Sequence, residues 1–158
     1  MSDTKELRRV LGHFATGVTI ITTRDSAGNF YGLTANSYTS VSLAPPLVLV
    51  CVDRKAESFA HFYDSKCFTV NILSEEQQEL SSRFAKSGGD KFTGVAYRLG
   101  TVGTPVIEGA VAVMDCHIVD TYEAGDHVIH MGEVSHTEIH GGRPLLFFQG
   151  QYRTLQDV

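Results

Sequence analysis

Histidines are the residues of this sequence that could most readily hold a metal ion. Four of the seven crowd into one region, at His127, His130, His136 and His140. On a β-strand, which rises about 3.3 Å per residue, His136 and His140 would stand about 13 Å apart, and His127 and His130 would point to opposite faces. A zinc ion needs all its ligands within about 2 Å of one centre. We therefore expect no metal site, and interpret these histidines as exposed or hydrogen-bonded strand residues.

The cysteines and serines offer no evident nucleophile. Cys51, Cys67 and Cys116 lie in separate apolar runs without Cys-x-x-Cys spacing, which favours buried, reduced thiols. The sequence also lacks a Gly-x-Ser-x-Gly elbow, a Gly-x-Gly-x-x-Gly turn and a P-loop. These absences argue against a serine hydrolase, a Rossmann site and a P-loop site. Reduced thiols indicate a cytoplasmic location.

One stretch, residues 32–42, is rich in backbone N–H groups and hydroxyls but poor in side-chain bulk. We expect it to be a long polar connection between two apolar strands. Gly32 and Ala35 would leave room for a polar heteroaromatic ring to approach closely. Composition alone favours the alternative interpretation, a Ser/Thr-rich loop with its hydroxyls in water.

Composition limits the size and partners of the protein. The 158 residues are 42% hydrophobic and 20% charged, which is enough for one core and predicts a single domain over residues 1–158. The net charge of −5, with no face rich in Lys and Arg, argues against nucleic acid as a partner. No apolar run approaches the roughly 20 residues that cross a bilayer, so we expect a soluble protein with no membrane partner.

Helical patterns occur at three places. Asp3 and Glu6 have capping-box spacing ahead of apolar residues that repeat at helical intervals, so a helix should open the chain. Residues 57–63 could form one or two helical turns. A second capping box at residues 74–77 predicts a polar helix that reaches about Lys86, and the loop after it is polar and basic.

Strand patterns are more numerous than helical ones. Runs of β-branched and apolar residues predict strands at 18–23, 30–35, 47–52, 68–73, 110–123, 128–139 and 145–148. The first two should pair as a hairpin, and so should the two longest. Because strands and helices do not alternate regularly, the predicted fold is mainly β, an antiparallel barrel with a few peripheral helices.

Two passages of the sequence resemble the short-chain flavin reductase family. They are residues 14–18 (Phe-Ala-Thr-Gly-Val) and residues 32–46, which end in Ala-Pro-Pro. Further landmarks follow in the family's order at 51–55, 68–73, 83–85, 90–92, 125–127 and 150–152. The similarity covers about Leu7 to Tyr152, and an ordered set of this length is more specific than any single motif.

The resemblance implies an FMN-binding split β-barrel, usually a homodimer with the flavin near the subunit interface. Its activity would be the transfer of hydride from NADH or NADPH to FMN or FAD, with hand-off of the reduced flavin to a separate monooxygenase. Such chemistry needs no protein nucleophile, because the two cofactors carry it. His127 is the one residue expected to act in catalysis, on the nicotinamide side of the site.

The resemblance also implies which residues contact the cofactors. The flavin ring and ribityl chain would be lined by Thr34, Ala35, Asn36 and Ser37, with Ser40, Val41 and Ser42 beside them. Backbone groups would border the flavin at Cys51, Val52 and Asp53. The candidates for the phosphate end are Lys55, Ser58 and Arg83, with Phe84 packed nearby. The nicotinamide side would be formed by Gly125, Asp126 and His127, and Tyr152 would lie by the flavin.

Several choices remain open at the level of sequence. Relatives often carry a small hydroxyl residue soon after the Lys55 position, whereas Ala56 and Glu57 precede Ser58 here, so which side chain meets the phosphate is not fixed. The pattern selects neither FMN over FAD nor NADH over NADPH. One alternative function is a flavoprotein that holds FMN tightly and acts directly on another small molecule. Others are a non-catalytic flavin-binding module and a purely structural barrel.

Overall fold

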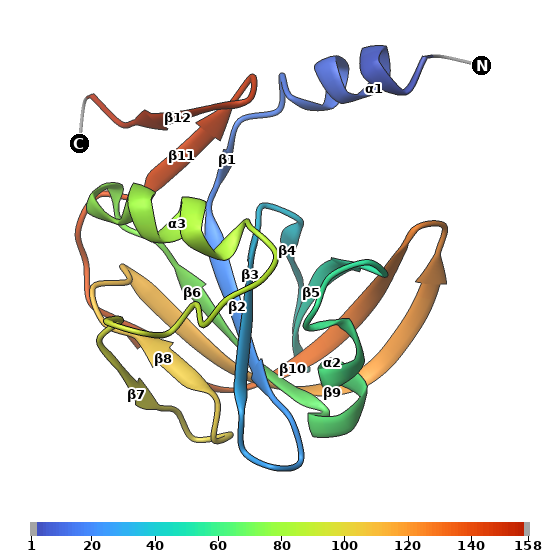
Figure 1. Cartoon of the computed structure of the whole chain (residues 1–158), viewed down its shortest axis with the longest axis vertical. Coiled ribbons are helices and arrows are strands. Elements are labelled where there is room, and N and C mark those ends of the chain that lie inside the picture. Colours follow the sequence, from blue (N-terminus) through green and yellow to red (C-terminus); the bar gives the residue numbers. More distant parts are fainter. Residues whose placement is uncertain (1–2, 157–158) are drawn as a thin grey trace.

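A curled antiparallel sheet of seven strands forms most of the molecule (Figure 1). The computed structural model describes residues 3–156. In spatial order the strands are β3 (Phe30–Ala35), β2 (Thr19–Arg24), β6 (Cys67–Ile72), β9 (Ala112–Ala124), β10 (His127–Ile139), β5 (Pro46–Asp53) and β4 (Tyr38–Leu43). The two edge strands, β3 and β4, follow one another in the chain with only Asn36 and Ser37 between them. The sheet must therefore curl until its two edges almost meet.

The mainly β fold class is confirmed, and both predicted hairpins are present as β2–β3 and β9–β10. The sheets do not close into a continuous barrel, because β3 and β4 end the strand order on opposite sides. Two smaller sheets flank the main one. The first contains β1 (Thr16–Gly17), β11 (Leu145–Phe148) and β12 (Gln151–Thr154), and the second contains β7 (Tyr97–Leu99) and β8 (Pro105–Ile107).

The helices are short and lie around the sheet (Figure 1). They are α1 (Thr4–Leu11), α2 (Phe59–Ser65), the 3₁₀ turn η1 (Glu75–Gln77) and α3 (Gln78–Phe84). At the start of η1 the Ser74 N–H donates to the Gln77 side chain at 3.0 Å, as the predicted capping box requires. The helix after it ends at Phe84, two residues before the predicted end. Between residues 3 and 156 there is no helix with the length and apolar character that crossing a membrane requires.

The prediction that residues 32–42 form one long connection is wrong. β3 continues to Ala35, and β4 begins at Tyr38, so only two residues form the turn. The serines and threonines of β4 have strand geometry because β4 pairs with β5 along most of its length. Strand pairing here overrides the turn preference of Ser-rich sequence.

Apolar side chains from the curled sheet and from α2 fill a common core. Ile21, Val50, Phe68 and Val70 from the strands and Phe62 from α2 are all 0% exposed. Burial of each such side chain contributes about 1.5–3 kcal/mol. Along β5 the residues at 48, 50 and 52 face this core, whereas Cys51 and Asp53 face the other way. The alternation therefore leaves two residues of β5 available for a site outside the core.

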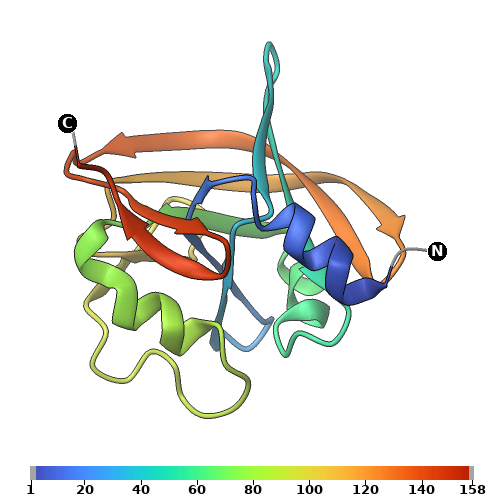
Figure 2. The same ribbon diagram turned by 90° about the horizontal axis from the view of Figure 1, so that it is seen from above.

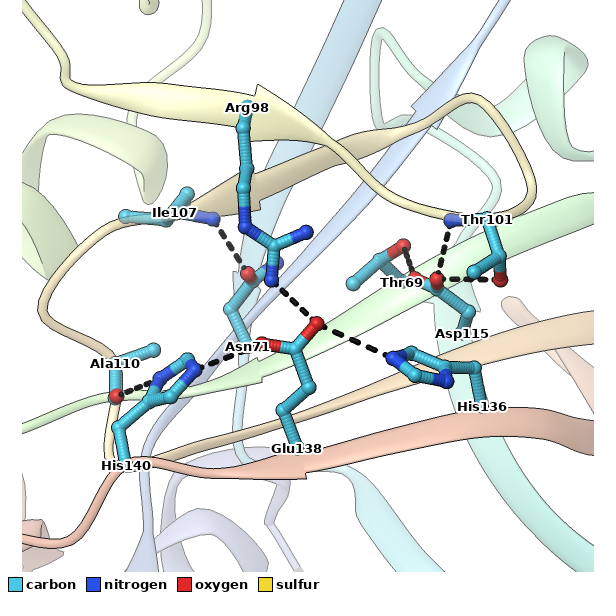
Figure 3. Close-up of polar contacts among 10 residues, drawn as sticks. All are labelled: Thr69, Asn71, Arg98, Thr101, Ile107, Ala110, Asp115, His136, Glu138 and His140. Carbon is cyan, nitrogen blue, oxygen red and sulfur yellow. Dashed lines mark hydrogen bonds and ion pairs between the residues drawn. The ribbon is translucent and has the colours of Figure 1, made fainter.

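Buried polar groups fasten the β7–β8 hairpin to the sheet (Figure 3). The Asp115 carboxylate, on β9, accepts hydrogen bonds from the Thr69 hydroxyl at 2.6 Å and from the backbone N–H of Thr101 at 2.6 Å. Asn71, on β6, accepts the Ile107 N–H at 2.8 Å. These contacts hold the hairpin on the side of the sheet that β6 and β9 form.

Candidate functional site

A cleft of about 390 Å³ lies where the two edges of the sheet approach one another. Three segments that are distant in sequence form it, around residues 33–37, 51–58 and 84–91, together with the start of β10. Its lining residues are Leu33 to Ser37, Cys51, Asp53, Lys55 to Ser58, Phe84 to Ser87, Lys91 and His127. This set is called the main cleft below. Its size falls in the range of about 300–1,000 Å³ that small-molecule sites have.

The turn between β3 and β4 forms one wall of the main cleft. The Ser37 hydroxyl donates to the Cys51 carbonyl at 2.9 Å, and the Cys51 N–H donates to the Ser37 carbonyl at 3.1 Å. The Thr34 hydroxyl donates to the Ser81 carbonyl of α3 at 2.6 Å. These bonds fix the turn against β5 and α3. The Asn36 carboxamide forms no hydrogen bond within residues 3–156 and remains available to a ligand.

Gly32 makes room for the Phe84 side chain and not for a ligand. This corrects the expectation that Gly32 leaves room for a bound ring. A Cβ atom at Gly32 would lie 2.7 Å from Cε1 of Phe84. The Phe84 ring is 1% exposed and packs against Phe92 with a centroid distance of 5.0 Å. Gly32 therefore allows α3 to approach β3 closely enough to close the cleft on that side.

Three ammonium groups line the main cleft, on Lys55, Lys86 and Lys91. The loops that carry them are held together by Glu57, whose carboxylate accepts the Gly88 N–H at 2.6 Å. The Lys91 ammonium donates to the carbonyls of Gly32 and Phe84, both at 3.4 Å, and burial lowers its pKa. Ammonium groups in such a setting bind a phosphate or carboxylate through charge-assisted hydrogen bonds.

Two hydroxyl groups accompany these cations, on Ser58 and Ser87. Ser58 is only 3% exposed and lines the cleft wall. Hydroxyl groups at these positions can donate to a ligand oxygen.

His127 forms the opposite side of the main cleft, at the start of β10. The strand register places it directly beside Asp53 of β5. Its Nδ1 lies 2.7 Å from the Asp126 carboxylate, and this hydrogen bond lowers the pKa of Asp126. The Nε2 atom is then the ring nitrogen left for a ligand.

Arg54 holds the turn that precedes His127. Its backbone N–H donates to the Asp126 carbonyl and its Nε donates to the Gly125 carbonyl, both at 3.1 Å. Arg54 also forms an ion pair with Glu123 on β9. The β9–β10 turn is thereby fixed to the end of β5, which sets the position of the histidine ring.

Ten of the residues expected from the sequence line the main cleft together. They are Thr34, Ala35, Asn36, Ser37, Cys51, Asp53, Lys55, Ser58, Phe84 and His127. Burial raises the pKa of the Cys51 thiol, so it stays protonated and is a poor nucleophile. Among the lining residues, the arrangement suits binding and orientation of a polar, anionic molecule better than covalent catalysis.

The other expected residues lie elsewhere. Val52 is 0% exposed in the core, and Gly125 and Asp126 lie in the turn behind His127. The β4 residues Ser40, Val41 and Ser42 do not line the main cleft. Arg83 lines a separate cavity, where its guanidinium donates to the Thr93 carbonyl at 3.0 Å.

Tyr152 lies in a side pocket of about 200 Å³ that adjoins the main cleft. The side pocket shares Thr34, Asn36 and Ala85 with the main cleft, and its other lining residues are Val18, Ser81, Phe147 and Tyr152. The Tyr152 hydroxyl is 2.7 Å from that of Ser81. Tyr152 therefore lies near the site without lining its main part.

Sequence reasoning missed several residues of the main cleft. The most informative are Lys86, Ser87 and Lys91, which take the place that Arg83 was expected to fill. The basic loop after the predicted helix was the signal that could have found them. The helix ends at Phe84, so the loop turns back toward Glu57 earlier than expected.

The chain matches a known protein family over most of its length. The family model described as "Flavin reductase like domain" matches residues 11–156. A probable flavin reductase from Rhizobium meliloti is 43% identical over 152 residues, which are 96% of this chain and 49% of that protein. This chain thus spans about half the length of that relative.

Two further relatives cover most of both chains. The reductase subunit HsaB of a flavin-dependent monooxygenase from Rhodococcus jostii is 42% identical over 98% of this chain and 79% of its own. The structure of the NADH:FAD oxidoreductase SgcE6 of Streptomyces globisporus, in complex with NAD and FAD fragments, has a TM-score of 0.93. It is 40% identical and covers 99% of this chain and 97% of its own. From the domain match and these relatives, we conclude that the chain belongs to the flavin reductase-like family.

Proposed function

We propose that this chain is an NAD(P)H:flavin oxidoreductase that reduces FMN or FAD in the main cleft and supplies the reduced flavin to a separate monooxygenase. The observation that carries the proposal is the main cleft itself. It joins an amide- and hydroxyl-rich wall, a group of three lysines and a histidine held by an aspartate. We extend the proposal to one domain over residues 1–158 and to the cytoplasm, where the three free cysteines would stay reduced.

The residues of the main cleft fit a flavin. The wall from Thr34 to Ser37 would hold the ring and its ribityl chain, with Asn36 offering a carboxamide that has no partner within residues 3–156. The Ser58 hydroxyl and the ammonium groups of Lys55, Lys86 and Lys91 would hold the phosphate. A protein with a net charge of −5 needs such local cations to bind an anion.

The chain's own residues contribute position and electrostatics. When bound, the flavin and the reduced nicotinamide supply the redox chemistry between them, by transfer of a hydride. The protein must hold the two rings at the right distance and angle, which is worth several kcal/mol of the barrier. His127 would contact the nicotinamide side, and Asp126 would fix the orientation of its ring.

A crossed steady-state assay tests this function. NADH and NADPH are each offered with FMN, FAD or riboflavin, and oxidation of the nicotinamide is followed by its absorbance. The proposal expects flavin-dependent oxidation well above the rate without protein. A rate that free flavin does not change would contradict it. A flavin that survives gel filtration, together with a poor rate on free flavin, would favour the tightly held FMN alternative.

The lysine group can be tested by binding alone. Lys55→Met should weaken FMN binding about tenfold, the effect of losing one charge-assisted contact of about 1.4 kcal/mol, and leave riboflavin binding unchanged. Quenching of flavin fluorescence measures both. Lys66→Met, at an exposed lysine outside the main cleft, is the matched control. Equal losses for FMN and riboflavin would show that Lys55 does not contact the phosphate.

We also propose a homodimer. The apolar residues of α1 are not covered by any part of residues 3–156, and neither are those at the tip of the β4–β5 hairpin. Phe14 is 79% exposed and Leu43 is 96% exposed. Figure 2 shows α1 outside the sheet and the β4–β5 hairpin projecting from it. Exposed apolar groups of this size are typical of an interface between subunits.

A further inference from the structure

The loop that follows α3 forms part of the wall of the main cleft. Residues 85–91, named the cleft loop below, contain neither helix nor strand, and residues 85–90 are all exposed. The members of the cleft loop that line the main cleft are Ala85, Lys86, Ser87 and Lys91. Figure 2 shows the cleft loop outside the sheet, beyond the end of α3. A segment with so few buried groups opens at a lower cost in free energy than the strands around it.

Both ends of the cleft loop are anchored. Just before it, the Phe84 ring is 1% exposed and packs edge-on against Phe92, with a centroid distance of 5.0 Å. At its far end, the Asp90 carboxylate accepts the Phe92 N–H at 3.0 Å and the Thr93 hydroxyl at 2.6 Å. An opening movement of the cleft loop must therefore occur between these anchors, in residues 86–89.

The middle of the cleft loop contains two consecutive glycines that allow such a movement. Gly88 has a φ of 88° and Gly89 has a φ of 76°, both in the left-handed region that residues with a Cβ atom rarely adopt. A Cβ atom at either position would meet no atom within 4 Å. The two glycines are therefore required by the backbone conformation and not by close packing. Glycine also changes its backbone conformation more readily than any other residue.

Glu57 ties the middle of the cleft loop to another segment of the cleft wall. Its carboxylate accepts the Gly88 N–H at 2.6 Å, which is a charge-assisted hydrogen bond. Glu57 lies 31 residues before Gly88 in the chain and itself lines the main cleft. Because Lys86 and Ser87 directly precede Gly88, this bond also sets where their side chains stand in the cleft.

We propose that Glu57 is a positioning residue that latches the cleft loop against the main cleft, and that breaking this latch sets the rate at which flavin leaves. The inference rests on the function proposed above, because a reductase that supplies flavin to another protein must release it. In the latched loop, Lys86 and Ser87 stand in the wall of the cleft that holds the flavin. Once the Gly88 N–H is released, the loop turns at its two glycines and carries both side chains away.

A purely electrostatic role of Glu57 predicts the opposite result. A carboxylate beside the three ammonium groups of the main cleft repels a phosphate group. Removal of its charge alone should therefore hold FMN more tightly and slow its release. Loss of the latch should instead make release faster, so the sign of the change separates the two roles.

Release of FMN from the loaded chain tests the proposal. The complex is diluted rapidly, and the recovery of flavin fluorescence gives the rate of release. Glu57→Ala should raise this rate about tenfold, and Glu57→Gln, which keeps an acceptor oxygen without the charge, should raise it less. Glu133→Gln, at an exposed glutamate of β10 outside the main cleft, is the matched control and should leave the rate unchanged.

A second variant tests the loop without changing any charge. Gly89→Ala should raise the rate of FMN release about fivefold, because alanine is strained at the φ of the latched loop. Gly28→Ala is its control, since Gly28 has a φ of 86° and open space for a Cβ atom between β2 and β3. Trypsin provides a measurement without flavin: it should cut after Lys86 faster in Glu57→Ala than in the wild-type chain.

Three results would overturn the inference. The first is a rate of FMN release that Glu57→Ala lowers or leaves unchanged. The second is a rate in Gly89→Ala equal to that of the wild type, which would mean that Glu57 does not act through the loop. The third is equal cleavage by trypsin after Lys86 in both chains. In each case the proposed function survives if the crossed assay shows flavin reduction; if the wild-type chain neither binds nor reduces flavin, both proposals fail together.

Discussion

At the residue scale, Asp126 fixes the orientation of the His127 ring. The two side chains lie 2.7 Å apart, and the pKa of Asp126 is lowered mainly by this hydrogen bond. A carboxylate on Nδ1 fixes the ring and leaves Nε2 for the donor. The side chain of His127 is 41% exposed, so it lies at the mouth of the main cleft where a second ring can enter.

Substitution of His127 separates donor binding from flavin binding. In His127→Ala the KM for the reduced nicotinamide should rise about tenfold, the effect of one lost hydrogen bond of about 1.4 kcal/mol. The flavin Kd should change less than twofold. Asp126→Asn, which keeps the size of the side chain, should give a smaller change in the same direction. Equal losses in donor and flavin affinity would contradict the role given to His127.

At the scale of elements, hydrophobic patterning predicted most strands but missed β4, the edge strand that follows the turn lining the main cleft. The β2–β3 and β9–β10 hairpins followed from alternating or β-branched residues and turn residues. β4 was missed because its serines carry no apolar signal, and its strand form depends on pairing with β5. Pairing between segments distant in sequence cannot be derived from local composition.

The same limit applies to the candidate site. Residues of the β3–β4 turn and of the β5 end were predicted because they lie within continuous passages of the family resemblance. Lys86 and Lys91 were noticed only as a basic loop, because their place beside Lys55 depends on the contact between Glu57 and Gly88. Conversely, Arg83 was assigned to the phosphate by the family resemblance and its charge, and the direction in which α3 carries its side chain could not be known from sequence.

Asp115 is the polar group that should matter most for the β7–β8 hairpin (Figure 3). Asp115 is 2% exposed and accepts hydrogen bonds from Thr69 and Thr101. Gly100 lies so close that a Cβ atom at Gly100 would be 2.5 Å from Oδ1 of Asp115. Asp115→Leu should lower the free energy of unfolding by about 3 kcal/mol, because buried donors lose their acceptor. Urea denaturation measures this change.

The control for Asp115 is Glu133→Leu, at an exposed position of the neighbouring strand β10. It should change the free energy of unfolding by less than about 0.5 kcal/mol. Neither variant should alter the flavin Kd, because neither residue lines the main cleft. A stable Asp115→Leu variant would show that the hairpin does not depend on this carboxylate.

At the scale of the whole molecule, we expect the free energy of unfolding to fall in mild acid because of His130. It is 0% exposed, stacks on Phe62 at a centroid distance of 5.3 Å and has no partner for Nε2 within residues 3–156. Burial lowers its pKa from 6.5 to about 4. Because the unfolded chain takes up the proton first, stability is full above pH 6.5 and falls progressively toward pH 4.

The variant His130→Gln removes this titration. Urea midpoints measured from pH 7 to pH 4.5 should fall less steeply for the variant than for the wild type, by up to one proton in the slope. The other carboxylates and histidines titrate in both proteins, so the difference isolates His130. Identical slopes would mean that His130 is accessible to protons in the folded state.

The proposed dimer is also a property of the whole molecule. Sedimentation should give twice the chain mass for the wild type. The variants Phe14→Ser and Leu43→Ser should shift it toward the monomer, because each removes an exposed apolar side chain from the surface assigned to the partner. Glu133→Ser, at an exposed polar position, should not. A monomeric wild-type chain would refute the proposed interface.

Anaerobic stopped-flow absorbance tests the central claim most directly. The chain with bound FMN is mixed with NADH or NADPH, and the loss of the oxidised flavin band near 450 nm is followed in a single turnover. The account predicts rapid bleaching that slows when the transferred hydrogen of the donor is deuterium. Bleaching no faster than that of free FMN with either donor would contradict it.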